Sequence, residues 1–364
     1  MKLLHFSPTF YSTDSVIGGG EKYVFYIVKA LQKYCSIAGY GIENLILSLG
    51  VNPGLYDAYD SVKLDIIKGA AWDYKSIYLP DLIQRINHAD CVIIHQCLTP
   101  LGLFVASHAR LCNKIVIGMD HGAGEHPLVS HTSEVGYIFD LLLAQSDFAA
   151  VSFIGLDAHT EVICGPIDSD YYKPMHIPRE KDLVVSVGRI LPHKGFERTI
   201  KAMPSSLRLV IIGTNSNTDY YNYLVSVIKD YAKQVRIVEN ASDDKVLDYF
   251  CRASLFVHAS THVGYDGAYY SKPELLGLAP LEALSCGTRS YVSSSGSLAE
   301  LGKIVGCQVF STDAELEDLL SDYSRTEIVD ISANEIRASV NEQYGLFQFG
   351  EKLVAQLKRL LKKM

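Results

Sequence analysis

Short runs of β-branched and leucine residues alternate with longer amphipathic stretches along this chain of 364 residues. In the first half, strands are predicted at residues 2–6, 44–49, 91–95 and 114–119. Between the first two, residues 21–34 have helical spacing, with Val24, Ile27, Val28 and Leu31 on one face. Such alternation is typical of βαβ units, in which helices connect parallel strands. The sequence therefore predicts an α/β fold with parallel sheets.

Residues 165–181 interrupt this alternation with three prolines and no periodicity, which indicates a linker. After it, the strand pattern restarts at 182–190, 207–213, 235–240 and 255–260, and Ser242 is placed to cap the helix that includes Val246 to Phe250. The chain is also long for a single hydrophobic core. We therefore expect two domains, at residues 1–170 and 176–345.

The composition excludes several classes of protein. Apolar residues make up 48% of the chain and charged residues 20%, which is typical of a folded protein. The net charge of -8, without a basic block before the last turns, argues against a nucleic-acid partner. Eight cysteines without a C-x-x-C pair favour reduced thiols and no metal site. Since neither a signal peptide nor a long apolar segment is evident, we expect a cytoplasmic protein.

The last stretch, residues 349–364, has the pattern of an amphipathic helix with a basic end. Its apolar side carries Leu353, Val354, Leu357, Leu360 and Leu361. We favour a docking helix whose terminal cations suit the helix dipole. The alternative is a peripheral contact with an anionic membrane.

Three consecutive glycines, Gly18, Gly19 and Gly20, precede Glu21 at the predicted start of the first helix. Glycines allow close approach of a ligand, and a helix amino terminus offers unpaired N–H groups to an anion. A turn without a ligand role is the equal alternative. Because position 23 is tyrosine, the dinucleotide fingerprint G-x-G-x-x-G is absent, which argues against a nicotinamide dehydrogenase.

A second motif follows a predicted strand at residues 185–195, VSVGRILPHKG. Arg189 and Lys194 come after the strand end and are flanked by Gly188 and Gly195. Ligands bind at the carboxyl ends of parallel strands, so these two cations can converge on one polyanion such as a diphosphate. A solvated surface pair is the alternative interpretation.

A third motif, residues 273–288, contains Glu274 and Glu282 with seven residues between them. Pro280 suits the first turn of a helix and Gly287 its end, which would place Glu282 near the helix amino terminus. Carboxylates accept hydrogen bonds from paired hydroxyls, as on ribose or a hexose. The motif thus fits a nucleotide sugar.

Together, GGGE, VGR-x-x-x-x-KG and E-x7-E, in this order, resemble the retaining GT-B glycosyltransferases of family 4, the glycosyl transferases group 1. The resemblance implies two Rossmann-like domains whose parallel sheets face an interdomain cleft. The first domain would bind the acceptor and the second the nucleotide-sugar donor. The C-terminal helix 349–364 would pack back on the first domain.

The resemblance also assigns roles to residues. Arg189 and Lys194 would hold the diphosphate, Glu282 the ribose and Glu274 the transferred sugar. His121, in the DHG at 120–122, would lie near the reacting carbon. The catalytic set implied is His121, Glu274, Arg189 and Lys194, and the donor would further contact Gly19, Gly20, Gly188, Gly277 and Leu278. No cofactor or metal is required, since Asp168 and Asp170 only imitate a metal-binding D-x-D.

The predicted activity is that of a hexosyltransferase-type enzyme acting from a UDP- or GDP-sugar onto an acceptor hydroxyl, in surface polysaccharide, lipid-linked glycan or metabolite synthesis. The sequence departs from the family at Leu275, Leu276 and Arg289, and residues 261–272 form an unusual stretch. The donor sugar and the acceptor therefore stay open. A GT-B-like nucleotide-sugar epimerase and an inactive nucleotide-sugar binding module are the alternatives.

Overall fold

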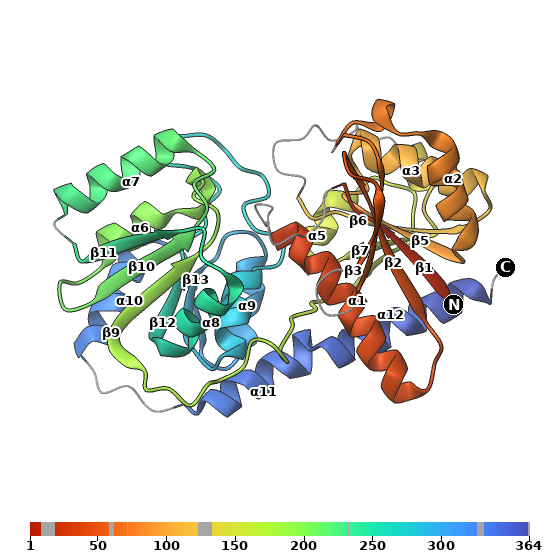
Figure 1. The fold of residues 1–364 in the computed structure, drawn as a ribbon. Coiled ribbons are helices and arrows are strands. Elements are labelled where there is room, and N and C mark those ends of the chain that lie inside the picture. The colour runs from red at the N-terminus through yellow and green to blue at the C-terminus, as the bar shows by residue number, and fades with distance from the viewer. Residues whose placement is uncertain are drawn as a thin grey trace. The chain divides into compact units, whose positions relative to one another are not determined.

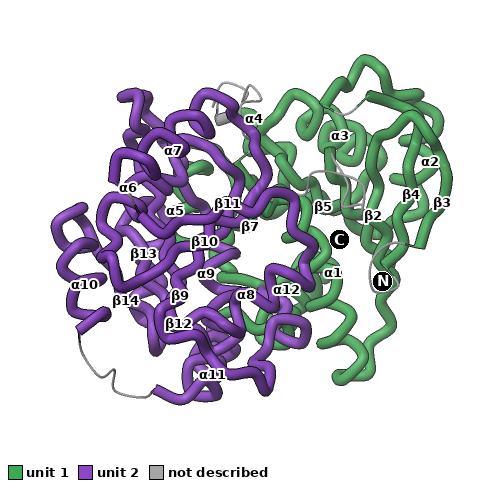
Figure 2. The backbone as a smooth tube through the Cα atoms, turned by 60° about the vertical axis from the view of Figure 1, so that its left-hand side comes forward, with its two compact units in different colours: residues 1–166, 344–364 green, residues 167–343 purple. Residues whose placement is uncertain are grey.

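The computed structural model describes residues 1–8, 19–57, 62–70, 72–122, 133–231, 233–325 and 331–362. The chain divides into two compact units, which are considered separately below (Figure 2). The first comprises residues 1–166 and 344–364, and the second residues 167–343. Residues 167–170, which were expected in the first domain, thus fall in the second unit.

The first unit is built on an eight-stranded sheet in the order β3-β4-β2-β1-β5-β6-β7-β8 (Figure 1). Its strands are β1 Lys2–Phe6, β2 Glu43–Gly50, β3 Gly54–Asp57, β4 Lys63–Lys68, β5 Cys91–His95, β6 Ile115–Met119, β7 Leu141–Ala144 and β8 Thr160–Val162. The expectation of a purely parallel sheet is wrong at one edge, because β3 pairs antiparallel with β4. Only a few residues connect these two strands, too few for the crossover that a parallel pair requires.

Helices cover both faces of this sheet (Figure 1). They are α1 Gly19–Ala38, α2 Leu79–His88, α3 Pro100–Leu111, α4 Ser133–Gly136, α5 Asp147–Ala150 and α12 Leu346–Leu361. The chain runs from β1 outward to β2 and then returns to β5 on the other side of β1. Because crossovers are right-handed, this change of direction places α1 on the opposite face from α2 and α3.

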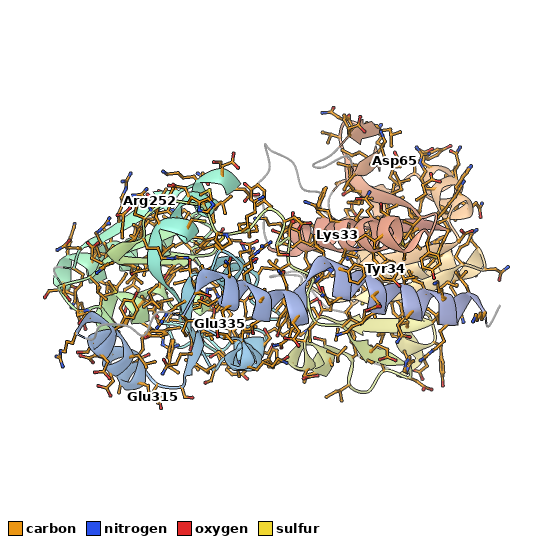
Figure 3. All side chains as sticks on the ribbon, turned by 90° about the horizontal axis from the view of Figure 1, so that it is seen from below. Lys33, Tyr34, Asp65, Arg252, Glu315 and Glu335 are labelled. Atoms are coloured by element: carbon orange, nitrogen blue, oxygen red, sulfur yellow. The ribbon has the colours of Figure 1, made fainter. Side chains whose placement is uncertain are left out.

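The C-terminal helix α12 packs against α1, as predicted (Figure 3). A Cβ atom at Gly350 would lie 2.3 Å from the carbonyl oxygen of Ala30, so the two helix backbones meet closely at this glycine. Tyr34 and Phe347 add a ring contact with centroids 5.2 Å apart. The helix is therefore an integral part of the first unit.

Two cations of the basic end also make contacts inside the first unit. The Nζ of Lys358 lies 3.4 Å from the ring centroid of Tyr40. Arg359 lies 3.7 Å from a carboxylate oxygen of Glu161. These contacts favour the docking interpretation of the helix. None of the helices in the described part of the chain is long and apolar enough to cross a membrane.

The second unit contains a six-stranded, parallel sheet in the order β11-β10-β9-β12-β13-β14. Its strands are β9 Glu180–Val187, β10 Arg208–Gly213, β11 Val235–Glu239, β12 Ala253–His258, β13 Arg289–Ser293 and β14 Cys307–Phe310. Its α-helices are α6 Phe196–Ala202, α7 Thr218–Asp230, α8 Asp243–Arg252, α9 Leu278–Ser285, α10 Asp313–Arg325 and α11 Ala333–Tyr344. The apolar core under α6 and α7 includes Tyr220, whose hydroxyl donates to the buried carboxylate of Glu197.

Ser242 caps α8 as predicted, since its side chain accepts a hydrogen bond from the backbone N–H of Lys245. In both units the strand order reverses at a central strand, between β1 and β5 in the first and between β9 and β12 in the second. Ligands of open α/β sheets bind outside the carboxyl ends of the strands at such a reversal. Ligand-binding residues are therefore expected at these two strand reversals, one in each unit.

Candidate functional site

In the second unit, three glycines shape the loop that follows β9. A Cβ atom at Gly213 would lie 1.9 Å from the carbonyl oxygen of Gly188, so this close approach requires glycine. Gly195 has a φ of +61°, and a Cβ atom there would lie 2.2 Å from the carbonyl oxygen of Ala259. The backbone of the loop that carries Arg189 and Lys194 thus packs closely against the residues at the carboxyl ends of β10 and β12.

A charged cluster lies at the carboxyl ends of β9 and β12. The Nζ of Lys194 is 2.6 Å from Oε2 of Glu274. The same carboxylate oxygen is 3.0 Å from Nε2 of His258, the last residue of β12. Ser260 Oγ lies 3.1 Å from that ring nitrogen. The structure therefore joins the second and third sequence motifs in one ion-paired group.

Burial and charge act against each other in this cluster. Burial raises the pKa of the Glu274 carboxyl, but Lys194 and His258 outweigh it and hold the pKa well below its usual range. The His258 imidazole is buried, and this desolvation lowers its pKa despite the nearby carboxylate. At neutral pH the cluster thus consists of one ammonium, one carboxylate and one neutral imidazole.

Arg189 is exposed and no ion pair is found for it among the described residues. It lies in the same loop as Lys194 and His193. Burial, and then the charges of Lys194 and Arg189, lower the pKa of the His193 imidazole to about 3. An exposed guanidinium in the same loop as a largely buried ammonium suits an anionic ligand that approaches from solvent.

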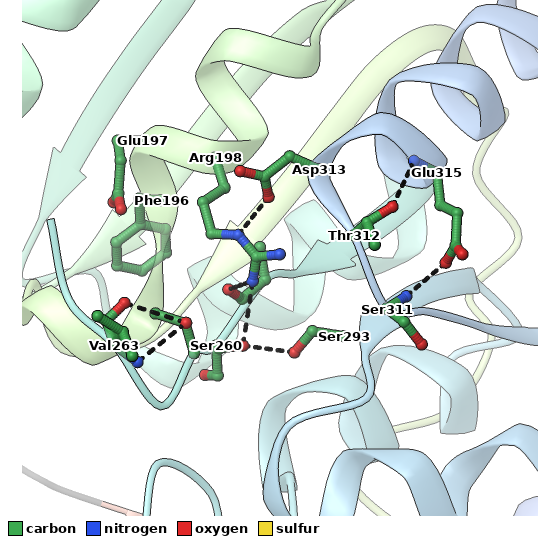
Figure 4. A network of polar contacts seen from close by, with 12 residues as sticks. Phe196, Glu197, Arg198, Ser260, Val263, Ser293, Ser311, Thr312, Asp313 and Glu315 are labelled. Carbon is green, nitrogen blue, oxygen red and sulfur yellow. Dashed lines mark hydrogen bonds and ion pairs between the residues drawn. The ribbon is translucent and has the colours of Figure 1, made fainter. Parts of the chain in front are cut away.

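The backbone around the cluster is held on several sides. A Cβ atom at Gly296 would lie 2.3 Å from the carbonyl oxygen of Glu274, and that oxygen also accepts a hydrogen bond from Ser297 N at 3.1 Å. Arg198 donates to the carbonyl oxygens of Ala259 and Ser260, as Figure 4 shows for this part of the network. Glu274 and the loop after β12 are therefore held by contacts within the second unit.

Glu282 is buried in α9 at the fifth position of this eight-residue helix, further from the amino terminus than expected. Its charge contributes, after burial, to the raised pKa of the Tyr172 hydroxyl, so the two side chains are close. Gly277 precedes the helix with a φ of +82°, and Leu278 is the first helical residue. Gly277, Leu278 and Glu282 thus lie immediately before, at the start of and within α9.

The unusual stretch 261–272 folds as a short hairpin. Tyr270 N donates to His262 O at 2.7 Å, and Gly264 N donates to Ala268 O at 2.9 Å. Tyr265 stacks on Tyr223 of α7, with ring centroids 4.3 Å apart and planes at 18°. The hairpin leads directly into Glu274, so it borders the charged cluster.

In the first unit, α1 begins at Gly19, two residues before the predicted start at Glu21, and it extends further than expected, to Ala38. Gly18 lies outside the described residues. A Cβ atom at Gly20 would lie 3.6 Å from Cβ of His121 and 3.5 Å from Nε2 of Gln96. The glycine motif and His121 are therefore neighbours at the carboxyl edge of this sheet.

His121 is part of a row of hydrogen-bonded rings. Its Nε2 lies 2.8 Å from Nδ1 of His95, and Nε2 of His95 lies 3.3 Å from Nδ1 of His5. The row ends on Asn44 Oδ1, 3.2 Å from His5 Nε2, and on Gln145 Oε1, 3.1 Å from His121 Nδ1. We call these five side chains the histidine row.

Burial makes a charged ring unfavourable in the histidine row. Desolvation lowers the pKa of His5 to about 4, and burial also holds the pKa of His95 well below its usual range. Burial also lowers the pKa of His121 to about 4, although Asp120, Gln145 and Glu21 favour its charged form. Three neutral imidazoles are therefore expected at neutral pH.

No described group of three or more histidine, cysteine, aspartate or glutamate side chains is arranged to hold a metal ion. Asp168, half of the apparent D-x-D, is buried, and its Oδ1 accepts a hydrogen bond from Tyr171 N at 3.3 Å.

Four polar residues at these sheet edges were not predicted as site residues: His258, His5, His95 and Gln145. Each lies within a strand or at its carboxyl end, and His5, His95 and His258 fall inside segments that were predicted as strands. A polar residue near the carboxyl end of a parallel strand is a recognisable signal for a ligand site. Their partners could not be inferred, because His5 and His95 are 90 positions apart.

Comparison with protein families places the charged cluster in a known group. Residues 170–304, which include Lys194, His258 and Glu274, match the family model described as glycosyl transferases group 1. This segment belongs to the group 1 glycosyltransferases. The family and the enzyme class predicted from the motifs are thus confirmed.

Solved structures show that this glycosyltransferase has the GT-B fold. HepE of Anabaena, crystallised with UDP and glucose, is similar with a TM-score of 0.75 and 16% identity, over 99% of this chain and 100% of that one. Sucrose-phosphate synthase of Thermosynechococcus elongatus matches at 0.71 and 15%, over 100% of both chains. A glycosyltransferase involved in avilamycin A biosynthesis matches at 0.69 and 18%, over 100% and 98%. A comparison with curated proteins finds no significant match.

Proposed function

We propose that this glycosyltransferase transfers a hexose from a UDP- or GDP-sugar to an acceptor hydroxyl, with retention of the anomeric configuration, as its resemblance to family 4 implies. The charged cluster of Lys194, Glu274 and His258 carries the proposal. It lies at the strand reversal of the second unit and inside the segment that matches the family. The UDP and glucose bound by the similar Anabaena protein support a nucleotide-sugar donor.

In this proposal, Arg189 and Lys194 bind the diphosphate and neutralise the charge that develops on the leaving phosphate. Arg189 is exposed, so it can meet the ligand first. Lys194 is already paired with Glu274, and a bound diphosphate would take over its ammonium. Glu274 would then be released to accept hydrogen bonds from sugar hydroxyls. The reaction needs no metal in this scheme.

The remaining roles follow from the resemblance. Glu282 would bind the ribose, and the backbone at Gly188, Gly277 and Leu278 would contact the donor. In the first unit, Gly19 and Gly20 would approach the diphosphate and His121 the reacting carbon. Cytoplasmic location stays a prediction of the sequence, and the acceptor and the pathway stay open.

A ligand panel followed by product analysis tests this function. Binding of a ligand to the native state raises the apparent melting temperature by mass action. We expect one nucleotide-diphosphate sugar in a panel of UDP- and GDP-sugars to raise the melting temperature, and its nucleoside diphosphate to do so as well. That donor, incubated with acceptors, should yield a glycoside of unchanged anomeric configuration by NMR. An epimerised sugar formed from the donor alone would contradict transfer, and a complete lack of turnover would indicate a binding module.

A further inference from the structure

The histidine row follows the strand order of the first sheet. Its five members come from five adjacent strands or the residues just after them, in the order β2, β1, β5, β6 and β7. These are Asn44, His5, His95, His121 and Gln145. All except His121 are buried. The sheet thus carries a continuous line of polar contacts that ends beside the glycine motif.

The number of protons in this line is constrained. The row contains four contacts, Asn44–His5, His5–His95, His95–His121 and His121–Gln145. A neutral imidazole has one N–H donor and one acceptor nitrogen, so three neutral rings supply three donors. If both terminal amides present oxygen, the four contacts require four donors. Either the row holds an extra proton, or one amide must present its NH2 group.

Burial favours the second solution. His5 and His95 are fully buried, and a charged ring there would be desolvated without a carboxylate among its row partners. The groups that face the row from neighbouring elements are the ring edge of Tyr23, with its centroid 5.1 Å from that of His121, and the carboxylates of Asp120 and Glu21. Both carboxylates act on His121 at the far end from Asn44.

Asn44 is the amide that can supply the missing donor. Its Nδ2 is buried and has no hydrogen-bond partner among the described residues. Rotation of the amide by 180° points this NH2 group at His5 Nε2, because the two ends of an amide have nearly the same shape. The rotation replaces an unpaired donor with an unpaired carbonyl oxygen, which proteins tolerate more often.

We propose that the row runs in one direction, from Asn44 Nδ2–H through the Nδ1–H groups of His5, His95 and His121 to Gln145 Oε1. This direction satisfies all four contacts with three neutral rings. It holds His121 as the Nδ1–H tautomer, with Nε2 accepting from His95 and no ring nitrogen left for proton transfer. His95 and His5 are then positioning residues for His121. The consequence for catalysis rests on the proposed function, in which His121 borders the reacting sugar.

The tautomer can be measured without any substrate. In the full-length protein with 15N-labelled histidine at pH 7, two-bond 15N–1H correlations distinguish a protonated from a bare ring nitrogen. We expect His5, His95 and His121 to show a protonated Nδ1 and a bare Nε2. His159 is the internal control, since its Nε2 lies 2.8 Å from a Glu161 oxygen and should carry the proton. A bare Nδ1 or an imidazolium at any of the three positions overturns the proposal.

An Asn44→Asp variant tests the proton count. An ionised carboxylate can only accept, so with three neutral rings the row lacks one donor and should take up one proton, either on a ring or on the carboxyl itself. We expect one such extra proton at pH 7 in this variant, located by 15N and 13C chemical shifts of the rings and the carboxyl, and none in the wild type. Asn87→Asp, an exposed asparagine of α2, is the matched control and should leave the rings neutral.

Three neutral rings together with an ionised carboxylate at position 44, in a folded Asn44→Asp protein, would contradict the proposed direction. If that variant fails to fold, the protonation pattern of the three rings in the wild type is by itself sufficient to support or overturn the proposal. Donor binding and turnover of the wild type are measured separately, so a failed tautomer prediction leaves the proposed function standing, and a protein without turnover leaves the tautomer result valid.

Discussion

Lys194 and Glu274 are oppositely charged side chains that lie 80 positions apart in the sequence and meet in the charged cluster. Their side chains are only 13% and 15% exposed. Removing one partner of such a pair leaves a charge without compensation in a place that water barely reaches. The sequence identified both residues but assigned them to different parts of the donor, because spacing alone could not show that they form an ion pair.

Replacing Lys194 with Ala should destabilise the protein by about 3 kcal/mol, since the Glu274 carboxylate keeps only His258 as a partner. The double variant Lys194→Met with Glu274→Gln should recover most of this loss, because no buried charge remains. Urea unfolding measures both. If Lys194→Ala had the same free energy of unfolding as the wild type, the ion pair would contribute little to stability.

The same pair predicts how stability depends on pH. The pKa of Glu274 is lowered in the folded protein, so its ionised form stabilises the fold above its ordinary value of 4.5. This contribution is lost as the pH falls from 4.5 through the lower pKa of the folded state. Below pH 4.5 the wild type should therefore lose stability faster than the Lys194→Met, Glu274→Gln protein. Parallel losses in denaturant titrations across this range would contradict the assignment.

At the scale of elements, strong patterns predicted the structure well and weak ones were missed. The strand at 91–95 and the cap at Ser242 are found as predicted. The short edge strand β3 was not predicted, since it contains only four residues, three of them exposed, and therefore no apolar run. The antiparallel edge was missed for the same reason.

The cap of α8 gives a direct test at this scale. Ser242→Ala removes the acceptor for Lys245 N and should destabilise the protein by about 1 kcal/mol. Ser205→Ala, an exposed serine in the turn after α6, should change stability by less than about 0.5 kcal/mol. Chemical unfolding measures the free energy of unfolding of both variants. Equal losses would show that the Ser242 side chain does not stabilise α8 as a cap.

The contact between α1 and α12 gives another. Gly350→Ala introduces a methyl group within 2.3 Å of Ala30 O, so we expect a net destabilisation of about 1–3 kcal/mol in spite of the better helix propensity of alanine. Glu351→Ala, at the exposed neighbouring position, is the control. A gain in thermal stability for Gly350→Ala would mean that α12 does not pack closely on α1.

At the scale of the whole molecule, the two-unit α/β architecture could be predicted from the sequence, but most of the partnerships at the sites could not. The alternation of strands and helices is a local pattern, and so are the motifs at 185–195 and 273–288. The histidine row and the partner of Lys194 depend on strand order, which single-sequence periodicity does not contain. His258 shows this limit, since it lay inside a predicted strand and gained a role only when the sheet brought Glu274 beside it.

The central claim is that cations after β9 bind the diphosphate of a nucleotide sugar. The most direct test is a calorimetric titration with UDP and, separately, with GDP. We expect one of them to bind the wild type and to bind Arg189→Ala about ten- to a hundredfold more weakly, as expected for a lost hydrogen bond to a charged group. Arg236→Ala, an exposed arginine of β11, should bind like the wild type. Equal affinity of Arg189→Ala and the wild type, or no binding of either nucleotide, would contradict the claim.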